Sequence, residues 1–494
     1  MRPQPLEPPT ALPCRMRRFF VMRQSEPLEH NHASIHCCCQ LGRAVVSLSV
    51  IATPDHFCGW WGASGSRLAL RFRTNSHLMR LAYISYEYPP DTAGGGIATS
   101  TSNTARMMAD RGHSVEVFTA SSFREGQFAE NGVLVNRVLV DNKQSFAKRI
   151  VDPFSERHRE QPFDLVEGPE YGADAFFVAK TFPAIPLVVK LRTPKRVIDE
   201  ISSEYVPWLS RLKYIVGRLA QGRRPNFFWR YDPESDIECL HTRAATLVVS
   251  PSEAIRDRLV PLWGLVERQI QVIPHPFEPS SALLEIPPDT ETRRVTYFGR
   301  LEARKGVLEL AAAIPTVLRE VPRARFRFIG RSLPHPRTRE DIRSLLEREL
   351  REHRHAVDFV DGVPYDQIPR YLADTDICAL PSVWESFGFT CLEAMAAARA
   401  VVVSRGTGMA EMVDHGTFGF VVEPKNSQTL ARALVQLLQD RLRRTRIGAS
   451  ARTRVLDHYN YKRIGQLQEK AYVYATERAM STRQPLSGGR VPPS

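Results

Sequence analysis

The pattern of hydrophobic and polar positions changes abruptly at Met79. Before it, residues 1–78 show no sustained period of either 2 or 3.6. After it, a mostly apolar segment at 81–86 predicts a strand, a glycine-containing loop follows, and a helical segment extends to Arg111. Together with the next strand, this order predicts the first β-loop-α-β unit of a doubly wound sheet. Further strands are expected at 114–119, 133–140, 164–167, 186–191, 246–250 and 270–273.

A second series of alternating strands and helices begins after a proline-rich junction. Five prolines between 274 and 288 interrupt the pattern, as expected of a segment between domains. No fixed-period repeat appears, so the pattern indicates two sequential α/β sheets and not a solenoid. The strands of the second sheet are expected at 294–298, 325–329, 357–360, 377–380, 401–403 and 418–422.

The two ends of the chain differ from this regular part. Residues 1–78 hold five of the eight cysteines, and we interpret them as a disordered extension or a mis-assigned start, with Met79 as the expected beginning of the folded protein. The tail at 481–494 consists mainly of Ser, Gly, Pro and Arg and is also expected to be disordered. The remaining Cys239, Cys378 and Cys391 are isolated, which indicates a reducing compartment and no metal site.

Composition narrows the possible partners only slightly. The 494 residues are 43% apolar and 24% charged, which is ordinary for a globular protein, and no run of 18 apolar residues predicts a membrane-spanning helix. The net charge of +13 falls to +8 without residues 1–78. This excess favours an anionic partner without identifying it.

The first glycine-rich loop contains Gly94, Gly95 and Gly96 at the carboxyl end of the first predicted strand. Such a loop lets backbone N–H groups approach an anion, which its position at the strand end favours over the alternative of a tight turn. A nicotinamide-binding fingerprint fits poorly, because Thr99 stands where its third glycine belongs and no acidic residue ends the next strand.

Two cations follow the first strand of the second sheet. Arg300 comes just after the strand, and Lys305 stands at the start of the next helix. Both are expected to project into the crevice above the sheet, where two fixed cations can neutralise a diphosphate leaving group. The alternative is a solvated turn held by salt bridges.

A second motif follows the strand at 377–380. Glu385 and Glu393 are eight positions apart, with Gly388 between them at the start of a predicted helix. The N–H groups of Phe389 and Thr390 would open that helix, whose positive end favours phosphate. The two carboxylates must then accept hydrogen bonds from neutral donors such as sugar hydroxyls. The alternative is that Glu385 only caps the helix.

At these residues, the chain resembles the retaining, nucleotide-sugar-dependent glycosyltransferases of family 4 (glycosyl transferases group 1) over about 79–474. The resemblance implies the GT-B fold, an α/β architecture in which two Rossmann-like domains face each other across a cleft. It also implies metal-independent transfer with retention of configuration and no cofactor besides the nucleotide-sugar donor. The departing diphosphate would help to accept the proton of the acceptor.

The same resemblance assigns roles to individual residues. Arg300 and Lys305 would bind the donor diphosphate, and Glu393 the ribose hydroxyls. Glu385 would contact the donor sugar together with a loop that supplies backbone amides. That loop comprises Phe387, Gly388, Phe389 and Thr390. Of these residues, Glu385, Arg300 and Lys305 are expected to be catalytic.

The resemblance also predicts a domain organisation. Residues 79–275 would form the acceptor-side domain, and residues 276–460 the nucleotide-sugar-binding domain. A final helix at 461–480 would pack back on the first domain, and closure of the two domains would bring donor and acceptor together.

Departures from the family pattern fall mainly on the acceptor side. Arg192, before Thr193 and Pro194, stands where many relatives have a histidine that contacts the donor sugar or the reaction centre. His275 occupies a position where asparagine is commoner. Glu170, after a predicted strand, could line the acceptor cleft or lie in a solvated loop.

Residues 206–224 combine apolar positions at helical spacing with several basic residues. This composition is typical of an interfacial helix that docks on anionic lipid and presents a lipid-linked acceptor, although core packing with a solvated basic face gives the same pattern. Aromatic residues lie nearby, but no recognised module accompanies them, and no nucleic-acid partner is expected.

We therefore interpret the chain as a cytoplasmic glycosyltransferase, peripheral at the inner membrane face, which moves a hexosyl group from a UDP- or GDP-sugar to a glycan, lipid-linked or small hydroxyl acceptor. A second hypothesis is a GT-B-like protein that binds a nucleotide sugar or glycan without turnover, motivated by Arg192. A third is a dinucleotide oxidoreductase that binds NAD at Gly94–Gly96.

Overall fold

The computed structural model describes residues 33–41, 44–52, 78–92, 95–140, 142–204, 208–223 and 231–481. The chain forms two units, residues 1–75 and residues 76–494, which are described separately. In the first unit, β1 (Ala33–Leu41) and β2 (Ala44–Ala52) pair antiparallel. The expectation of a wholly unstructured extension does not hold for these two segments. β2 is rich in valine and isoleucine, and these β-branched residues favour strands.

The first domain of the second unit contains an eight-stranded sheet in the order β10-β9-β8-β7-β3-β4-β6-β5. All neighbouring strands are parallel except β5 and β6, which form an antiparallel edge that the sequence pattern did not predict. Its strands are β3 (Arg80–Ile84), β4 (Ser114–Ser121), β5 (Gly126–Glu130), β6 (Val133–Leu139), β7 (Leu165–Pro169), β8 (Leu187–Lys190), β9 (Leu247–Ser250) and β10 (Ile270–Val272).

The second domain contains a six-stranded, fully parallel sheet in the order β13-β12-β11-β14-β15-β16. Because parallel strands need crossover helices, both sheets are flanked by helices, and the predicted pair of Rossmann-like domains is confirmed. The strands are β11 (Arg294–Phe298), β12 (Arg325–Ile329), β13 (Val357–Val360), β14 (Ile377–Leu380), β15 (Ala400–Ser404) and β16 (Phe420–Val422).

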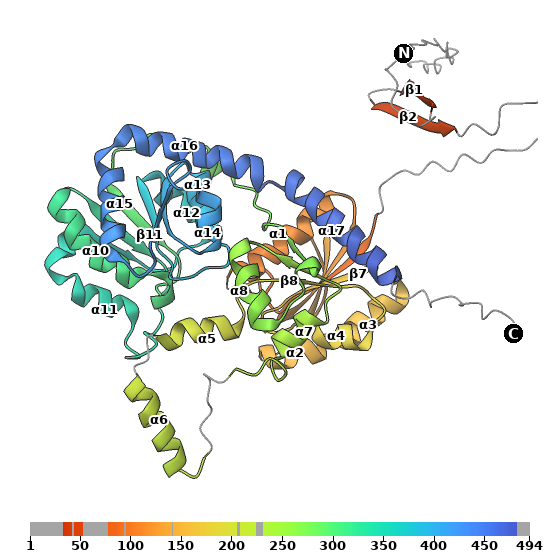
Figure 1. Cartoon of the computed structure of the whole chain (residues 1–494), viewed down its shortest axis with the longest axis horizontal. Helices are drawn as coiled ribbons and strands as arrows, with labels where there is room; N and C mark the ends of the chain where they lie inside the picture. Colours follow the sequence, from red (N-terminus) through yellow and green to blue (C-terminus); the bar gives the residue numbers. More distant parts are fainter. Residues whose placement is uncertain are drawn as a thin grey trace, which may run out of the picture. The chain divides into compact units, whose positions relative to one another are not determined.

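Helices of the first domain follow its strands in the chain, and most of them flank its sheet, whereas α6 stands apart from it (Figure 1). They are α1 (Gly96–Asp110), α2 (Lys143–Arg149), α3 (Val151–Glu160), α4 (Phe176–Thr181), α5 (Lys195–Glu204), α6 (Trp208–Ala220), α7 (Ile237–Arg243) and α8 (Glu253–Trp263), with the 3₁₀ turn η2 (Glu267–Gln269). None of the helices in the described part of the chain is both long and apolar enough to cross a membrane.

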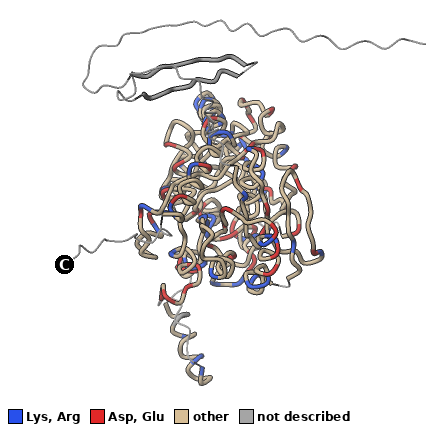
Figure 2. The backbone as a smooth tube through the Cα atoms, turned by 90° about the vertical axis from the view of Figure 1, so that its right-hand side faces the viewer, with Lys and Arg blue, Asp and Glu red and all other residues tan. Residues whose placement is uncertain are grey.

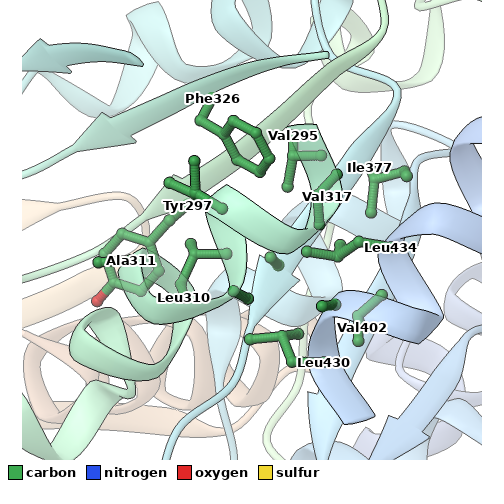
Figure 3. Packing of buried hydrophobic residues seen from close by; sticks show 14 of the residues in the cluster. Val295, Tyr297, Leu310, Ala311, Val317, Phe326, Ile377, Val402, Leu430 and Leu434 are labelled. Carbon is green, nitrogen blue, oxygen red and sulfur yellow. The ribbon is translucent and has the colours of Figure 1, made fainter. Parts of the chain in front are cut away.

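Helices of the second domain pack in the same way. They are α9 (Ser281–Leu284), α10 (Val307–Glu320), α11 (Ile342–Glu349), α12 (Ile368–Ala373), α13 (Phe389–Ala396), α14 (Gly408–Val413), α15 (Ser427–Gln439) and α16 (Arg441–His458), with the 3₁₀ turns η3 (Ala303–Lys305), η4 (Arg351–Ala356) and η5 (Tyr365–Gln367). Figure 3 shows how Leu310 and Val317 of α10 and Leu434 of α15 meet Val295 and Phe326 of the sheet. The apolar stripe of α10 has helical spacing, so burial of one face explains its position.

The last helix, α17 (Tyr461–Ser481), lies against the first domain (Figure 1). Its Tyr472 is fully buried, and the hydroxyl group donates a hydrogen bond of 2.7 Å to the carboxylate of Glu167 on β7. On the surface of α17, Glu469 accepts two hydrogen bonds from the guanidinium of Arg111. The end of the chain therefore ties the second domain to the first, while the exact domain boundaries stay an interpretation of the sequence.

Candidate active site

A cavity of about 390 Å³ lies where the carboxyl ends of strands from both sheets meet. The first domain contributes residues that follow β3, β7, β8 and β10, and the second domain residues that follow β11, β14 and β15. Ligands of open parallel sheets bind at this edge because the loops after the strands converge there. From the first domain, the lining includes Glu87, Gly95, Gly96, Ile97, Tyr171, Arg192, Thr193, Ile198 and His275.

Arg300 enters the cavity from the loop after β11. Gly299 has a φ of 138°, and a Cβ at Gly330 would lie 1.9 Å from the carbonyl oxygen of Gly299, so both positions need glycine. The hydroxyl of Tyr297 donates a hydrogen bond of 2.6 Å to the carbonyl of Arg300. The backbone is thereby fixed, while the side chain of Arg300 is 48% exposed and lies 3.6 Å from Glu302.

Lys305 lies at the end of η3 and forms an ion pair with Glu385. Burial lowers the pKa of Lys305, against the opposite influence of Glu385. Burial alone would raise the pKa of Glu385, but Lys305 and Arg304 outweigh it and hold the pKa below its usual value. The cavity therefore contains an ionised carboxylate beside a cluster of cations at neutral pH.

The loops that carry this ion pair are in direct contact. A Cβ at Gly306, which follows Lys305 with a φ of 72°, would lie 1.9 Å from the carbonyl oxygen of Pro381. The N–H of Val383 donates a hydrogen bond of 2.9 Å to the carbonyl of Arg304. Glycine at 306 is required for this approach, which sets the distance between the two loops.

The start of α13 faces the cavity. Gly388, with a φ of 110°, is the residue before the helix, and a Cβ there would lie 2.6 Å from the Cγ of Met409. Phe387, Phe389 and Thr390 also line the cavity. No side chain caps this helix, so its first N–H groups are available to an anion.

Glu393 lies one turn into α13 and does not belong to the residues that line the 390 Å³ cavity. Its side chain is nearly buried, with 7% of the residue exposed. Burial raises the pKa of Glu393 to about 7. The structure therefore separates the two predicted carboxylates: Glu385 is ionised within the cavity, and Glu393 is half-protonated near neutral pH behind the helix start.

The predicted glycine loop lies on the opposite side of the same cavity. Gly95 precedes α1, and a Cβ at Gly96 would lie 3.8 Å from the ring of Phe389. Gly94 lies outside the described residues. The structure thus brings the first-domain loop and the start of α13 together.

Arg192 and His275 form a contact that the sequence did not predict. The Nη1 of Arg192 lies 2.8 Å from the Nε2 of His275, and the imidazole ring stacks on Phe389 with 5.7 Å between ring centroids. Burial lowers the pKa of His275 well below its usual value, and Arg192 adds to this effect. The ring is therefore neutral and can accept the hydrogen bond from the guanidinium.

Glu170 is completely buried near this contact and is not a lining residue. Neither carboxylate oxygen has a hydrogen bond of normal geometry. Burial raises the pKa of Glu170 to about 8, with a further contribution from Glu238. Of its two interpretations, the solvated loop is wrong, because Glu170 is buried. A place on the acceptor side stays a prediction, since Glu170 lies outside the residues that line this cavity.

Direct bonds between the two domains surround the cavity, and sequence reasoning missed the residues that make them. The hydroxyl of Ser252 donates to the carbonyl of Ser386 at 2.6 Å, and the hydroxyl of Thr193 donates to that of Ser386 at 3.0 Å. The carboxylate of Glu411 accepts from the N–H groups of Glu253 and Ala254 at the start of α8. The only available signal was Ser252 as a helix-capping residue, which does not reveal a partner in another domain.

No group of three or more His, Cys, Asp or Glu side chains that could hold a metal ion occurs in the part of the chain that the structure describes. The cations of the cavity and the start of α13 are instead the groups that suit an anionic ligand. Such an arrangement can bind a diphosphate and stabilise it as a leaving group.

Two family descriptions match the two halves of this structure. "Glycosyl transferase 4-like domain" matches residues 95–276, and "Glycosyl transferases group 1" matches residues 292–440. Together they cover about two thirds of the chain.

Individual relatives agree with this assignment. An uncharacterized glycosyltransferase of Methanocaldococcus jannaschii is 25% identical over 81% of this chain and 99% of its own length. D-inositol 3-phosphate glycosyltransferase of Kineococcus radiotolerans is 27% identical over 77% of this chain and 92% of its own length.

A solved structure shares the fold. HepE of Anabaena, crystallised in complex with UDP-glucose, superposes with a TM-score of 0.57 and 18% identity over 80% of this chain and 99% of its own. With both halves matched in sequence and in fold, the chain belongs to the family 4 glycosyltransferases of the GT-B fold.

Proposed function

We propose that this glycosyltransferase moves a hexosyl group from a UDP- or GDP-sugar to a glycan, lipid-linked or small hydroxyl acceptor, with retention of configuration and without a metal ion. The observation that carries the proposal is the Lys305–Glu385 pair beside the uncapped start of α13, in a cavity that both domains line. The UDP-glucose complex of the structurally similar HepE supports a nucleotide-sugar donor.

The diphosphate of the donor is assigned to the second domain. Lys305 has three donors, of which Glu385 uses one in the ion pair, so the others can reach phosphate oxygens. Arg300, with an exposed guanidinium on a fixed backbone, supplies a second cation. The N–H groups of Phe389 and Thr390 complete the set at the positive end of α13.

The sugars of the donor are assigned to the two carboxylates. Glu385 stays ionised between Lys305 and Arg304 and can accept hydrogen bonds from hydroxyls of the transferred sugar, together with the loop at Phe387 and Gly388. Glu393 would accept from the ribose hydroxyls. Hydrogen bonds from sugar hydroxyls to an ionised carboxylate are charge-assisted and therefore stronger than hydrogen bonds between neutral groups.

Transfer would proceed on one face of the sugar. The bond from the anomeric carbon to the diphosphate oxygen breaks, and the bond to the acceptor hydroxyl oxygen forms on the same side. The acceptor proton passes to the departing diphosphate. Arg300 and Lys305 stabilise the charge that develops on that diphosphate, which is their catalytic contribution.

The acceptor is assigned to the first domain, beside Gly95, Gly96 and Arg192. The name of the Kineococcus relative identifies a phosphorylated polyol as its acceptor. A hydroxyl acceptor on a glycan, a lipid-linked sugar or a small polyol would enter at this side of the cavity.

We also propose that the enzyme works in the cytoplasm and contacts the inner membrane face through residues 206–224. Within this segment, α6 stands apart from the rest of the domain in two perpendicular views (Figures 1 and 2). Its helix contains no acidic residue, and Lys213 and Arg218 are among its basic ones. Its exposed apolar side chains are Trp208, Leu209, Leu212, Val216 and Leu219.

The chemistry of α6 favours an anionic lipid surface as its partner. Trp208, Leu212, Val216 and Leu219 share one face, and exposed tryptophan and leucine beside basic residues are the composition of interfacial helices. Trp208 is 70% exposed, which is costly in water and favourable at the boundary of lipid headgroups and acyl chains.

Donor hydrolysis and transfer assays test the proposed activity. A panel of UDP- and GDP-hexoses is incubated with the full chain and with polyol, glycan and lipid-linked acceptors, and calorimetry measures donor binding. We expect saturable binding and transfer to at least one acceptor. Saturable binding without hydrolysis or transfer to any acceptor would favour the non-catalytic alternative.

Three further measurements test the stereochemistry, the metal independence and the oxidoreductase alternative. The anomeric configuration of the product, determined by NMR, tests retention, and excess EDTA tests metal independence. Calorimetry with NAD tests the oxidoreductase hypothesis, which requires binding at the glycine loop.

A further inference from the structure

Four cations line the cavity, and three of them have a carboxylate partner. Lys305 pairs with Glu385, and Arg304 lies 3.1 Å from Glu302 and 4.0 Å from Glu385. Arg300 lies 3.6 Å from Glu302. These three belong to the second domain, where the diphosphate is assigned.

Arg192 is the fourth cation, and none of the ion pairs among the described residues includes it. The residue is only 7% exposed, and its Nε has no hydrogen-bond partner. One terminal nitrogen contacts the neutral ring of His275 and, at 3.4 Å, the carbonyl of Leu191. A guanidinium stays charged in proteins, so the cavity wall contains a buried charge that no described carboxylate contacts as an ion pair.

Burial lowers the pKa of Arg192, and the carboxylates of Glu170, Glu167 and Glu87 oppose this effect from a distance, without an ion pair. Lys190, two positions earlier, adds positive charge and lies 3.6 Å from Glu167, whose carboxylate also accepts from Tyr472. Burial raises the pKa of Glu170, whereas the charge of Arg192 lowers it, and no ion pair joins the two side chains. Glu87 lines the cavity but forms no ion pair with Arg192.

The position of Arg192 is close to the place where the substrates meet. The next residue, Thr193, is bonded to Ser386 in the loop assigned to the transferred sugar. His275, the partner of Arg192, stacks on Phe389, and Phe389 in turn lies beside Gly96 of the first-domain loop. Arg192 therefore lines the first-domain side of the cavity, whereas the cations assigned to the diphosphate come from the second domain.

We propose that Arg192 binds an anionic group, a carboxylate or a phosphate, carried by the donor's transferred sugar or by the acceptor. This inference rests on the proposed function and specifies the substrate class of that same site. The planar guanidinium can form two parallel hydrogen bonds to either group, which also supplies the missing counterion. A neutral hexose and a neutral acceptor would leave the buried charge unpaired, and such substrates are bound less well.

A comparison of anionic and neutral substrates tests this inference. The donor arm compares UDP- and GDP-hexoses with the corresponding uronates, and the acceptor arm compares inositol with inositol 3-phosphate. For each, Kd and kcat/KM are measured for the wild type, Arg192→Gln and Arg192→Lys. The matched control is Arg323→Gln, an exposed arginine in the turn before β12, and circular dichroism confirms folding of each variant.

We expect the wild type to prefer the anionic member in one arm by roughly tenfold to a hundredfold. Arg192→Gln should abolish this preference, Arg192→Lys should retain part of it because lysine keeps the charge, and Arg323→Gln should leave it unchanged. A preference among the donors would place the anionic group on the transferred sugar, and a preference among the acceptors would place it on the acceptor.

Other outcomes separate this inference from the proposed function. Binding of nucleotide sugars without an anionic preference in either arm, or a preference that survives Arg192→Gln, would overturn the role of Arg192 and leave the transferase proposal intact. Failure to bind any nucleotide sugar would overturn both.

Discussion

Lys305 and Glu385 are eighty positions apart in sequence and form an ion pair inside the cavity that both domains line. The loops that carry them touch where Gly306 meets the carbonyl of Pro381. A cation assigned to the diphosphate and a carboxylate assigned to the sugar therefore keep a fixed spacing before any ligand binds. This preorganisation favours charge stabilisation, because no rearrangement is needed during the reaction.

Replacement of Lys305 by alanine should weaken the binding of UDP or GDP. The loss of a charge-assisted contact with the diphosphate predicts an increase in Kd of roughly tenfold to a hundredfold, measured by calorimetry. The matched control is Lys425→Ala, which removes an exposed ion pair with Glu204 and should have little effect. Equal affinities of wild type and Lys305→Ala would refute the assignment of the diphosphate.

Nucleotide binding should depend on the ionisation of Glu393. Burial raises its pKa to about 7, and the carboxylate is a stronger acceptor for ribose hydroxyls than the neutral acid. Affinity for UDP or GDP should thus increase between pH 6 and pH 8. Glu393→Gln should remove this increase, and it should also reduce the discrimination between ribose and deoxyribose nucleotides. A pH dependence that is unchanged in Glu393→Gln would exclude Glu393 as its source.

Gly306→Ala should destabilise the second domain by about 2–4 kcal/mol, because the new Cβ meets a backbone oxygen at 1.9 Å and φ is positive. Urea unfolding measures this loss. Gly416→Ala separates the steric clash from the cost of the positive φ. Gly416 has a φ of 86°, but a Cβ added there would have no atom within 4 Å. That control should cost only about 1–2 kcal/mol, the ordinary penalty of a left-handed residue. Similar losses in both variants would show that the contact with Pro381 is unimportant.

Glu170→Gln should change the pH dependence of stability. Burial raises the pKa of Glu170 to about 8 in the folded state, whereas the unfolded value is about 4.3. Between these values the folded state holds the proton more firmly, so the contribution of this group to stability falls as pH rises. The variant lacks the effect and should gain stability relative to wild type by up to about 1.4 kcal/mol per pH unit in that window.

Urea unfolding of both proteins at pH 5, 6, 7 and 8 measures the difference. Other titrating groups are common to the two proteins and cancel in the comparison. A difference that stays constant over this range would contradict the raised pKa.

Binding to vesicles should depend on the apolar face of α6. Co-sedimentation with vesicles rich in phosphatidylglycerol should detect the wild type and should be weakened at high salt, since basic residues contribute. Leu212→Asp with Val216→Asp should reduce binding at least tenfold. The control is Leu442→Ser, which removes an even more exposed leucine from α16. Loss of binding in the control, or none in the α6 variant, would argue against this surface.

Much of the architecture could be predicted from local patterns. The strand at 294–298, the apolar stripe of α10 and the polar N-cap of α15 follow from side-chain periodicity and capping, which depend on neighbours in sequence. The valine-rich strand β2 and the antiparallel edge β5 were missed. Their pairing partners decide whether such segments form strands, and periodicity alone does not reveal a partner.

For the candidate site, too, some features could be predicted from the sequence and others could not. The family resemblance and the residue types suited to a nucleotide sugar follow from the sequence alone, because these residues have characteristic spacing. They are Arg300, Lys305, Glu385 and the glycine before α13. The burial of Glu170 and the contact of Arg192 with His275, without an ion pair to any described carboxylate, could be seen only in the folded structure. Burial and charge pairing are set by residues distant in sequence, since the surrounding side chains determine the solvation and electrostatic energy of each group.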